Sequence, residues 1–243
     1  MKNFGVIVPA RYKSSRFPGK PLALISGEYL ILRVLSNLRD CIPKDRLWVA
    51  TDDQSIKSVC EDNGYSVVLT PEACLTGTDR IAEANKILDF DYVVNVQGDE
   101  PLLDSKLILN FLDYFLSEEF DCVNCYSAIH SEEMGLSVNV PKLVFSESKK
   151  LLYISRSPIP LNKDGEIRKL HKQVCVYGFS KSALSEYGID KLKTPLESIE
   201  DIEILRLIEK DFDVMMYELN SHSHAVDIPE DVAIVEELLR RRG

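Results

Sequence analysis

Short apolar runs alternate with segments of helical spacing along the first half of the chain. The runs are rich in β-branched residues and predict buried strands at 4–8, 47–50, 65–69 and 91–96. Between and after them, apolar residues recur every three or four positions, which predicts helices over 29–39, near 56–60, over 76–87 and after residue 104. Because strand and helix alternate, we expect right-handed crossovers and a mostly parallel, doubly wound, Rossmann-like α/β sheet.

Capping residues mark where two of these helices begin. Thr76 and Asp79 stand three positions apart, as in a capping box, and Asp104 precedes the next apolar segment. Pro9 ends the first predicted strand, and Pro229 fits the first position of a C-terminal helix. In doubly wound sheets ligands bind at the carboxyl ends of the strands, so function is expected at 9–20, 51–52, 71–78 and 97–101.

The pattern changes from about residue 121. Short strands separated by turn-rich stretches are predicted at 121–129, 140–145, 151–155 and 173–179. We interpret 121–180 as an antiparallel extension of the sheet with a projecting hairpin, whose exposed edge is expected to pair in a homodimer. A helix near 196–209, a strand at 214–219 and a helix over 229–241 follow. Without an internal repeat or a long linker, one domain is expected over 1–243.

Charge is unevenly distributed along the chain. A formal net charge of −10 argues against binding nucleic acid through bulk electrostatic attraction. Residues 1–27 nevertheless contain no acidic residue, and their cationic residues are Lys2, Arg11, Lys13, Arg16 and Lys20. A local cationic site on an acidic protein indicates a small, highly anionic ligand.

Neither membrane insertion nor secretion is predicted. No stretch approaches the roughly 20 apolar residues needed to cross a bilayer. The N-terminus runs directly into the first strand, without the pattern of a signal peptide. A cytoplasmic protein without a membrane partner is therefore expected.

The cysteines suggest buried thiols. Cys122 and Cys125 form a C-x-x-C, which in other settings indicates a metal or redox site. Here the two residues fall in a predicted strand, where residues three apart point to opposite faces. No second C-x-x-C follows to complete four zinc ligands. Reduced, buried cysteines are therefore expected.

The segment from Pro9 to Pro21 is the first candidate site. It follows a strand and contains four cations, two serine hydroxyls and a glycine. Arginine suits bidentate contact with phosphate, lysine acts as a point charge, and backbone N–H groups supply further donors. The segment is neither a Walker A loop nor a G-x-G-x-x-G motif. It predicts a phosphate site of another kind, with a solvated basic loop as the alternative.

Two acidic positions are candidates for a metal site. Asp99 lies in a turn after a predicted strand, and Asp227 stands just before the C-terminal helix. Because Mg²⁺ takes one or two carboxylates plus phosphate oxygens, these two residues could share a cation. Each also has a simpler explanation, Asp99 as a turn residue and Asp227 as part of a helix cap. His222 and His224 share a strand face and are interpreted as incidental.

Taken together, these segments resemble the 3-deoxy-manno-octulosonate cytidylyltransferase (CMP-Kdo synthetase) family over nearly the whole chain. The matching segments are 9–21, 49–52, 76–80, 95–101, 152–156, 176–178, 195–197 with Glu203, and 226–231. The resemblance implies a nucleotidyltransferase sheet and a Mg²⁺-dependent homodimer. It also implies transfer of CMP from CTP to the anomeric hydroxyl of an eight-carbon ulosonic acid, with release of pyrophosphate, for lipopolysaccharide or capsule synthesis.

The resemblance further implies roles for individual residues. The triphosphate would be held by Arg11, Ser15, Arg16 and Lys20, beside Pro9 and Ala10. The nucleoside would face Thr76, Gly77 and Arg80. The metal would be held by Asp99 and Asp227, which with Arg16 and Lys20 would carry the catalysis. The sugar pocket would contain Gln97, Arg156, Gln173, Tyr177, Glu203 and Ile204, with Arg156 paired to the sugar carboxylate.

Most departures from the family pattern lie on the sugar side. Gln173-Val174-Cys175 replaces a usual His-Leu-Gly, and Ile204 replaces a usual glutamine. Cys74 stands where histidine is common, and Ile228 replaces a threonine N-cap. Because the sugar-side changes remove hydrogen-bonding groups, we hypothesise an acceptor that is less hydroxylated, amino-substituted or otherwise modified. Alternatively, neighbouring residues compensate and plain Kdo is accepted.

Two further functions are compatible with the sequence. The same fold could act on a different acidic sugar or sugar phosphate. A non-catalytic nucleotide-binding protein is the other possibility. The presence of Asp99 and Asp227 together with Lys20 argues against that second function, because a mere binder does not need two metal carboxylates.

Overall fold

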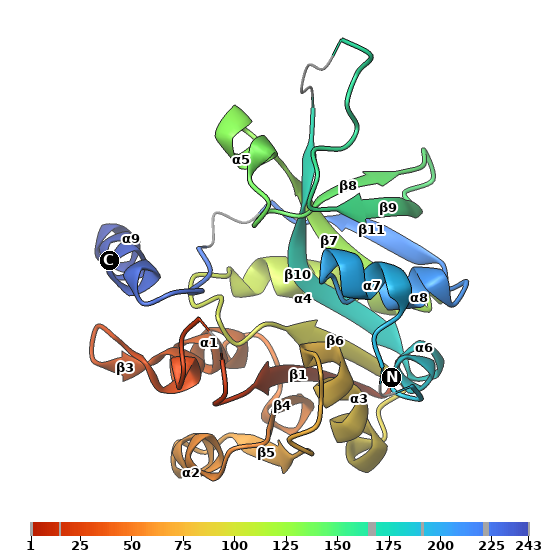
Figure 1. Cartoon of the computed structure of the whole chain (residues 1–243). Helices are drawn as coiled ribbons and strands as arrows, with labels where there is room; N and C mark the ends of the chain where they lie inside the picture. The colour runs from red at the N-terminus through yellow and green to blue at the C-terminus, as the bar shows by residue number, and fades with distance from the viewer. Residues whose placement is uncertain (1, 15, 165–168, 191, 221–223, 243) are drawn as a thin grey trace.

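A mixed β-sheet runs through the molecule, with helices on both faces (Figure 1). The computed structural model describes residues 2–14, 16–164, 169–190, 192–220 and 224–242. In this part of the chain, the main path of the sheet has the order β11 (Val214–Glu218), β7 (Cys122–Ala128), β10 (His171–Ser180), β6 (Tyr92–Val96), β1 (Phe4–Ala10), β4 (Leu47–Thr51) and β5 (Ser66–Leu69). Strand β8 (Lys142–Phe145) pairs with β10 and with β9 (Leu151–Ser155).

The strand directions confirm the predicted fold class. Strands β6, β1, β4 and β5 pair in parallel, as expected from the alternation of strands and helices. Strand β10 is antiparallel to both of its neighbours, β6 and β7, while β11 is parallel to β7. The antiparallel strands β8, β9 and β10 all come from residues 121–180, where the change of pattern predicted them.

Two hydrophobic clusters fill the space on either side of the sheet. Helices α1 (Leu30–Arg39), α2 (Gln54–Asp62) and α4 (Ser105–Ser117) cover one face and α3 (Gly77–Leu88), α6 (Lys181–Tyr187) and α8 (Leu205–Glu209) the other. Strand β1 contributes to both clusters, since Val6 and Val8 pack on one side and Ile7 on the other. A strand buried on both faces reads as a continuous apolar run, which is what predicted it.

The structure corrects several predicted boundaries. The helix expected near 196–209 is two short helices, α7 (Pro195–Glu200) and α8, because Asp201 adopts a left-handed conformation with φ 52° between them. Strand β1 continues through Pro9, which pairs with Ala50. Helices α6 and α5 (Glu132–Leu136) and the ribbon of β2 (Leu24–Ile25) and β3 (Glu28–Tyr29) were not predicted. The C-terminal helix α9 is Glu230–Arg242.

The paired cysteines of β7 lie on opposite faces of the sheet, as expected. Cys122 belongs to the cluster under α3 and Cys125 to the cluster under α4, and neither forms a disulfide. Burial raises the pKa of both thiols well above the ordinary value. The described residues contain no group of three or more His, Cys, Asp or Glu side chains that could hold a metal. None of the described helices is long and apolar enough to cross a bilayer.

Candidate functional site

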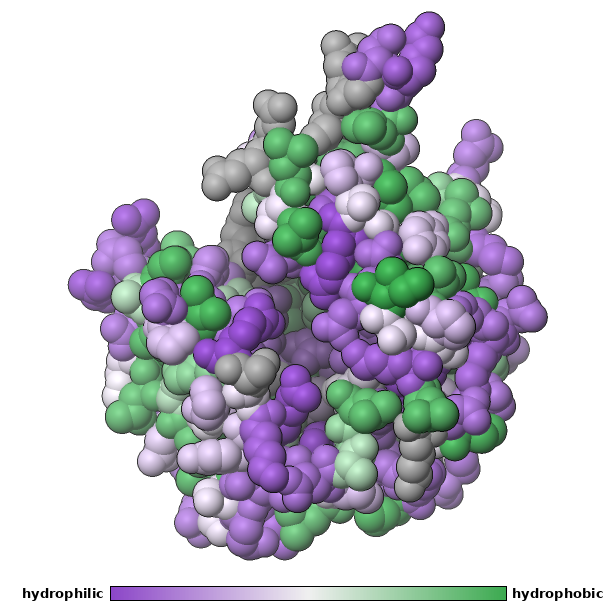
Figure 2. Space-filling view, viewed as in Figure 1, coloured by the Kyte–Doolittle hydropathy of each residue, from purple (hydrophilic) through white to green (hydrophobic). Residues whose placement is uncertain are grey.

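The segments predicted to carry function meet at the carboxyl edge of the parallel strands. A Cβ atom added to Gly98, just beyond β6, would lie 3.0 Å from the carbonyl oxygen of Pro9 in β1. A Cβ atom on Gly77, at the start of α3, would lie 3.4 Å from Pro9 Cγ and 3.7 Å from Gln97 Nε2. Figure 2 shows the surface hollowed near the centre of this view, between α9 and the helices α7 and α8. The absence of a side chain at Gly98 lets the end of β6 approach β1, whereas a Cβ at Gly77 would make ordinary contacts.

The basic loop after β1 closes on itself. The Gly19 N–H donates to the carbonyl oxygen of Tyr12 at 2.9 Å, and the Lys20 N–H donates to Phe17 at 3.1 Å. Gly19 has φ 70°, a conformation that side chains disfavour, and a Cβ atom added to it would lie 3.4 Å from the Tyr12 ring. Lys20 then begins a 3₁₀ turn, η1 (Lys20–Leu22). The loop thereby sets the position of the Lys20 backbone.

The Lys20 ammonium lies between the two predicted metal ligands. Its Nζ is 2.6 Å from Asp99 Oδ2 and 3.8 Å from Asp227 Oδ1. Arg16 Nη2 also contacts Asp227 Oδ1, at 2.9 Å. The two carboxylates therefore converge on a single point, although 128 positions of sequence numbering separate them, 99 to 227.

Asp227 is held in place from both sides. The Val226 N–H donates to the Asp99 carbonyl oxygen at 2.9 Å, and the Val226 side chain is buried. Asp231 Oδ2 accepts from the backbone N–H groups of Asp227 and Ile228, at 2.8 and 3.0 Å. This contact is the carboxylate half of a capping box, so the start of α9 is stabilised although Ile228 offers no side-chain cap.

The pair of aspartates fits a magnesium site. Both ligands are carboxylates, the hard oxygen donors that Mg²⁺ prefers, and two of them leave room for phosphate oxygens. Asp99 is 23% and Asp227 46% exposed, so an ion can reach both. The position between them already holds a cationic group, the ammonium of Lys20. The sequence prediction that these residues come together is therefore met by the geometry, while metal binding itself stays a prediction.

The other residues predicted to bind nucleotide differ in their burial and in whether their side chains already have partners. Arg80 is buried and paired, with Nη2 2.8 Å from Asp52 Oδ2 and Nη1 2.7 Å from Thr70 Oγ1. Thr76 accepts from the Asp79 N–H in the predicted capping box, so its hydroxyl is also engaged. Arg11 is exposed, Ala10 is buried in β1, and Ser15 lies outside the described residues.

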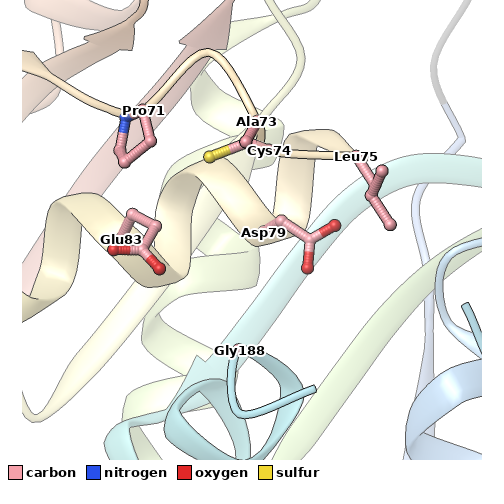
Figure 3. A pocket seen from close by; sticks show the side chains of 7 residues that line it. All are labelled: Pro71, Ala73, Cys74, Leu75, Asp79, Glu83 and Gly188. Carbon is pink, nitrogen blue, oxygen red and sulfur yellow. The ribbon is translucent and has the colours of Figure 1, made fainter. Parts of the chain in front are cut away.

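A small pocket lies between the loop before α3 and the first turns of α3 (Figure 3). Its lining includes Pro71, Cys74 and Leu75 from the loop before α3, and Asp79 and Glu83 from α3 itself. The cavity volume is about 20 Å³, roughly the space of one water molecule. Burial raises the pKa of the Cys74 thiol, which stays protonated near neutral pH. Cys74 thus stands next to the start of α3, where a histidine was expected from the resemblance.

A buried arginine, which sequence analysis missed, fastens the start of α3 to α7 and α8. Arg206 is fully buried, with Nε 2.6 Å from Glu197 Oε2 and Nη1 2.6 Å from Asp79 Oδ1. Its guanidinium also lies 3.9 Å from the centre of the Tyr187 ring. In the sequence, Arg206 looks like one charge of a short amphipathic helix, and no local pattern distinguishes it from an exposed residue.

The predicted sugar residues on β10 form a closed hydrogen-bonded group at a bulge. Gln173 Nε2 donates to Asn124 Oδ1 at 2.9 Å and to Tyr177 Oη at 3.2 Å. Asn124 Nδ2 in turn donates to the carbonyl oxygens of Val174 and Val176, where the pairing of β10 with β7 shifts register. The unusual residue Gln173 is therefore bonded to Tyr177, another residue predicted for the sugar pocket, which is itself buried.

Cys175 sits in the same bulge. Burial raises the pKa of its thiol to about 12, so it remains a neutral thiol at physiological pH. A neutral thiol is a weak hydrogen-bonding group, which makes this position less polar than Gln173 or Tyr177.

Glu203 and Ile204, both predicted for the sugar pocket, have different surroundings in the structure. Glu203 accepts from the Gly77 N–H at 3.2 Å, the Thr78 N–H at 3.0 Å and the Thr78 hydroxyl at 2.6 Å. Its carboxylate thus satisfies the free donors at the start of α3. Ile204 is 1% exposed and packs in the core cluster, so in this structure it offers no surface to a ligand.

Arg156 is fixed by backbone carbonyl groups. Its Nη1 donates to Val138 at 2.9 Å, its Nη2 to Asp201 at 3.0 Å, and its Nε to Glu200. Among the described residues, acceptors are found for three of the five guanidinium N–H groups, which leaves two for a ligand. The partner predicted for the sugar carboxylate is therefore anchored at the end of β9.

The comparisons with known proteins agree with the strand order and with the motifs. The sequence profile of the family described as Cytidylyltransferase matches residues 5–218. The chain belongs to the cytidylyltransferase family.

Named relatives and a solved structure narrow the similarity within this family. A 3-deoxy-manno-octulosonate cytidylyltransferase of Myxococcus xanthus is 38% identical over 98% of this chain and 96% of its own. An 8-amino-3,8-dideoxy-manno-octulosonate cytidylyltransferase of Shewanella is 36% identical over 98% of both chains. A structure of CMP:2-keto-3-deoxy-manno-octonic acid synthetase complexed with CTP superposes with a TM-score of 0.91, at 28% identity over the whole of both chains.

We expect Glu203→Gln to loosen the first turn of α3. An amide has one acceptor oxygen, and its NH₂ group would face the N–H donors of Gly77 and Thr78. The free energy of unfolding should fall by about 1–3 kcal/mol, and hydrogen exchange by mass spectrometry should be faster at residues 77–79.

Glu209→Gln is the matched control. Glu209 accepts from the N–H groups of Leu196 and Glu197 at the start of α7, so its loss should speed exchange there and leave α3 unchanged. Unaltered exchange at 77–79 in Glu203→Gln would show that the carboxylate does not hold this turn.

Proposed function

We propose that this protein transfers CMP from CTP to the anomeric hydroxyl of a 3-deoxy-ulosonic acid and releases pyrophosphate, with Mg²⁺ as cofactor. One observation carries the proposal: Arg16 and Lys20 meet Asp99 and Asp227 at the carboxyl edge of a cytidylyltransferase sheet. The names of the relatives and of the structural neighbour support CTP as donor and an octulosonate as acceptor.

The cationic loop after β1 would bind the triphosphate of CTP, the nucleotidyl donor. CTP and an ulosonate are both anions, so bringing them together costs electrostatic repulsion that positive charge must offset. Arg16, Lys20 and the exposed Arg11 supply that charge on one closed loop. Transfer of the nucleotidyl group requires in-line positioning and charge stabilisation more than covalent chemistry, which suits a site built from fixed charges.

Asp99 and Asp227 would hold the metal. When bound, Mg²⁺ would neutralise phosphate charge and favour the deprotonated form of an alcohol nucleophile. The contribution of the chain is to keep both carboxylates at one point, through the Val226 contact with Asp99 and the cap formed by Asp231.

The acceptor would lie beside β10, near Gln97, Tyr177 and Arg156. Arg156 retains two N–H donors on a guanidinium fixed by three carbonyl groups, which suits the carboxylate of the sugar. Gln173 bonds to Tyr177 and Asn124, which supports the alternative that neighbouring residues compensate for this departure from the family pattern. Relatives are named for both Kdo and its 8-amino derivative, and both sugars are candidate acceptors.

Pyrophosphate release tests the function directly. With CTP and Mg²⁺, we expect release that depends on Kdo or on 8-amino-3,8-dideoxy-octulosonate. Asp99→Asn and Asp227→Asn should each lower kcat by at least about 10²-fold, because each removes a metal carboxylate. Efficient kcat/KM with Kdo would reject the hypothesis of a modified acceptor.

Asp113→Asn is the control, since Asp113 lies exposed on α4. All three variants should keep the unfolding midpoint of the wild type to within a few degrees. Tight CTP binding without pyrophosphate release from any ulosonate would favour the non-catalytic nucleotide binder instead.

The homodimer predicted for residues 121–180 is also part of the proposal. Four large apolar side chains of this region are exposed: Leu136, Val138, Leu152 and Leu161. Figure 2 shows hydrophobic surface on the upper part of the molecule, where β8 and β9 lie in Figure 1. Apolar patches of this kind are typical of surfaces that pair with another protein.

Light scattering after size-exclusion chromatography should give the mass of a dimer for the wild type. Leu152→Glu should shift the mass toward that of a monomer, because it replaces an exposed apolar side chain of the proposed interface with a charge. Ile87→Glu, at an apolar position on α3 that is at least as exposed as Leu152, should leave the dimer intact. A monomeric wild type would contradict the proposed assembly.

A further inference from the structure

We propose that Lys20 is a built-in substitute for the metal, so that Mg²⁺ and the triphosphate can bind fully only when the charged residues of the site exchange partners. The inference rests on the proposed function, because it takes Asp99 and Asp227 as metal ligands. It adds that each ligand alone binds against an existing ion pair, and that the two ligands relieve each other.

The site contains two cations and two carboxylates, and each of them takes part in an ion pair. The four residues are Arg16, Lys20, Asp99 and Asp227. Lys20 contacts both aspartates, at 2.6 and 3.8 Å, and Arg16 contacts Asp227 at 2.9 Å. Lys20 is 17% and Asp99 23% exposed, so their attraction is less screened by water than that of a surface pair. The carboxylates that a metal needs and the cations that a triphosphate needs are therefore bound to one another.

Either ligand alone must break this arrangement. A divalent ion that takes the two carboxylates leaves the Lys20 ammonium without a partner in a half-buried site, which is costly. A triphosphate that takes Lys20 and Arg16 leaves two neighbouring carboxylates unpaired. When both ligands bind, every charge finds a new partner. The coupling must be reciprocal, so each ligand raises the affinity of the other by the same factor.

The chain around Lys20 permits such an exchange. The ammonium sits on a flexible stem with three rotatable donors, while the backbone that carries it is fixed by Gly19 and Pro21. The neighbouring pair of Arg80 and Asp52 differs in this respect. Arg80 is held by Thr70 as well, and both members of the pair are almost fully buried, so no exchange is expected there.

Binding of single ligands tests the exchange without turnover. Mn²⁺, which accepts the same oxygen ligands as Mg²⁺, is titrated in the absence of nucleotide and followed by electron paramagnetic resonance. We expect Lys20→Met to bind Mn²⁺ about three- to tenfold more tightly than the wild type, since the competing cation is gone. Isothermal titration with CTP in EDTA should show Asp99→Asn binding CTP more tightly than the wild type, because Lys20 is released.

Lys181→Met is the matched control. Lys181 forms a lysine–aspartate pair of the same 2.6 Å length with Asp89, far from the site, and its loss removes the same charge. This variant should bind Mn²⁺ as the wild type does. If the loss of one positive charge alone raised the affinity, Lys181→Met would bind Mn²⁺ as tightly as Lys20→Met does. That result would contradict the proposed exchange of partners.

The outcomes separate the two proposals. The proposed exchange is overturned if Lys20→Met binds Mn²⁺ no more tightly than the wild type does. It is also overturned if neither protein binds Mn²⁺ detectably. Mn²⁺ binding by wild type that survives in Asp99→Asn and Asp227→Asn contradicts the proposed metal site itself. Tighter Mn²⁺ binding in Lys20→Met that is lost on adding Asp227→Asn supports both.

Discussion

The attraction between Lys20 and two aspartates is the interaction on which the site depends. Asp99 follows a strand in the middle of the sheet, and Asp227 precedes the last helix. Two carboxylates placed this close would repel each other if no cation lay between them. Lys20 and Arg16 supply that cation from a loop that closes through Gly19. The sheet topology brings the three segments to one edge, and the ion pairs fix how their ends meet.

A second set of buried charges supports the nucleotide side of the site. At the start of α3, Asp79 closes the capping box of the helix itself. Two groups reach it from elsewhere: Glu203 accepts from its N–H groups, and Arg206 links Asp79 to Glu197. Removing one member of a buried group of an arginine and two carboxylates strongly destabilises the fold, because it leaves a buried charge without a partner. The loop before α3 thus owes its position to residues that lie more than 100 positions later in the chain.

Much of the fold could be predicted because local patterns determine it. Buried strands read as apolar runs, and Thr76 and Asp104 mark helix starts by chemistry that acts over three residues.

Contacts between distant segments leave no such trace in the sequence. Glu203 was assigned to the sugar pocket by resemblance, and its hydrogen bonds to α3 could not be read from the sequence because its partners are 125 and 126 positions away. Likewise, the left-handed Asp201 divides a helix that periodicity alone predicts as continuous. The convergence of Asp99 and Asp227 was expected from their chemistry and from the family motifs, whereas the position of Lys20 between them is seen only in the folded chain.

A crystal structure with CTP and Mn²⁺ bound, in which the metal is located by its anomalous scattering, tests the central claim most directly. The account predicts a peak within ligand distance of one carboxylate oxygen each from Asp99 and Asp227, with Lys20 Nζ moved from Asp99 to a phosphate oxygen. A metal held by phosphate oxygens alone, with Lys20 still paired to Asp99, would contradict it.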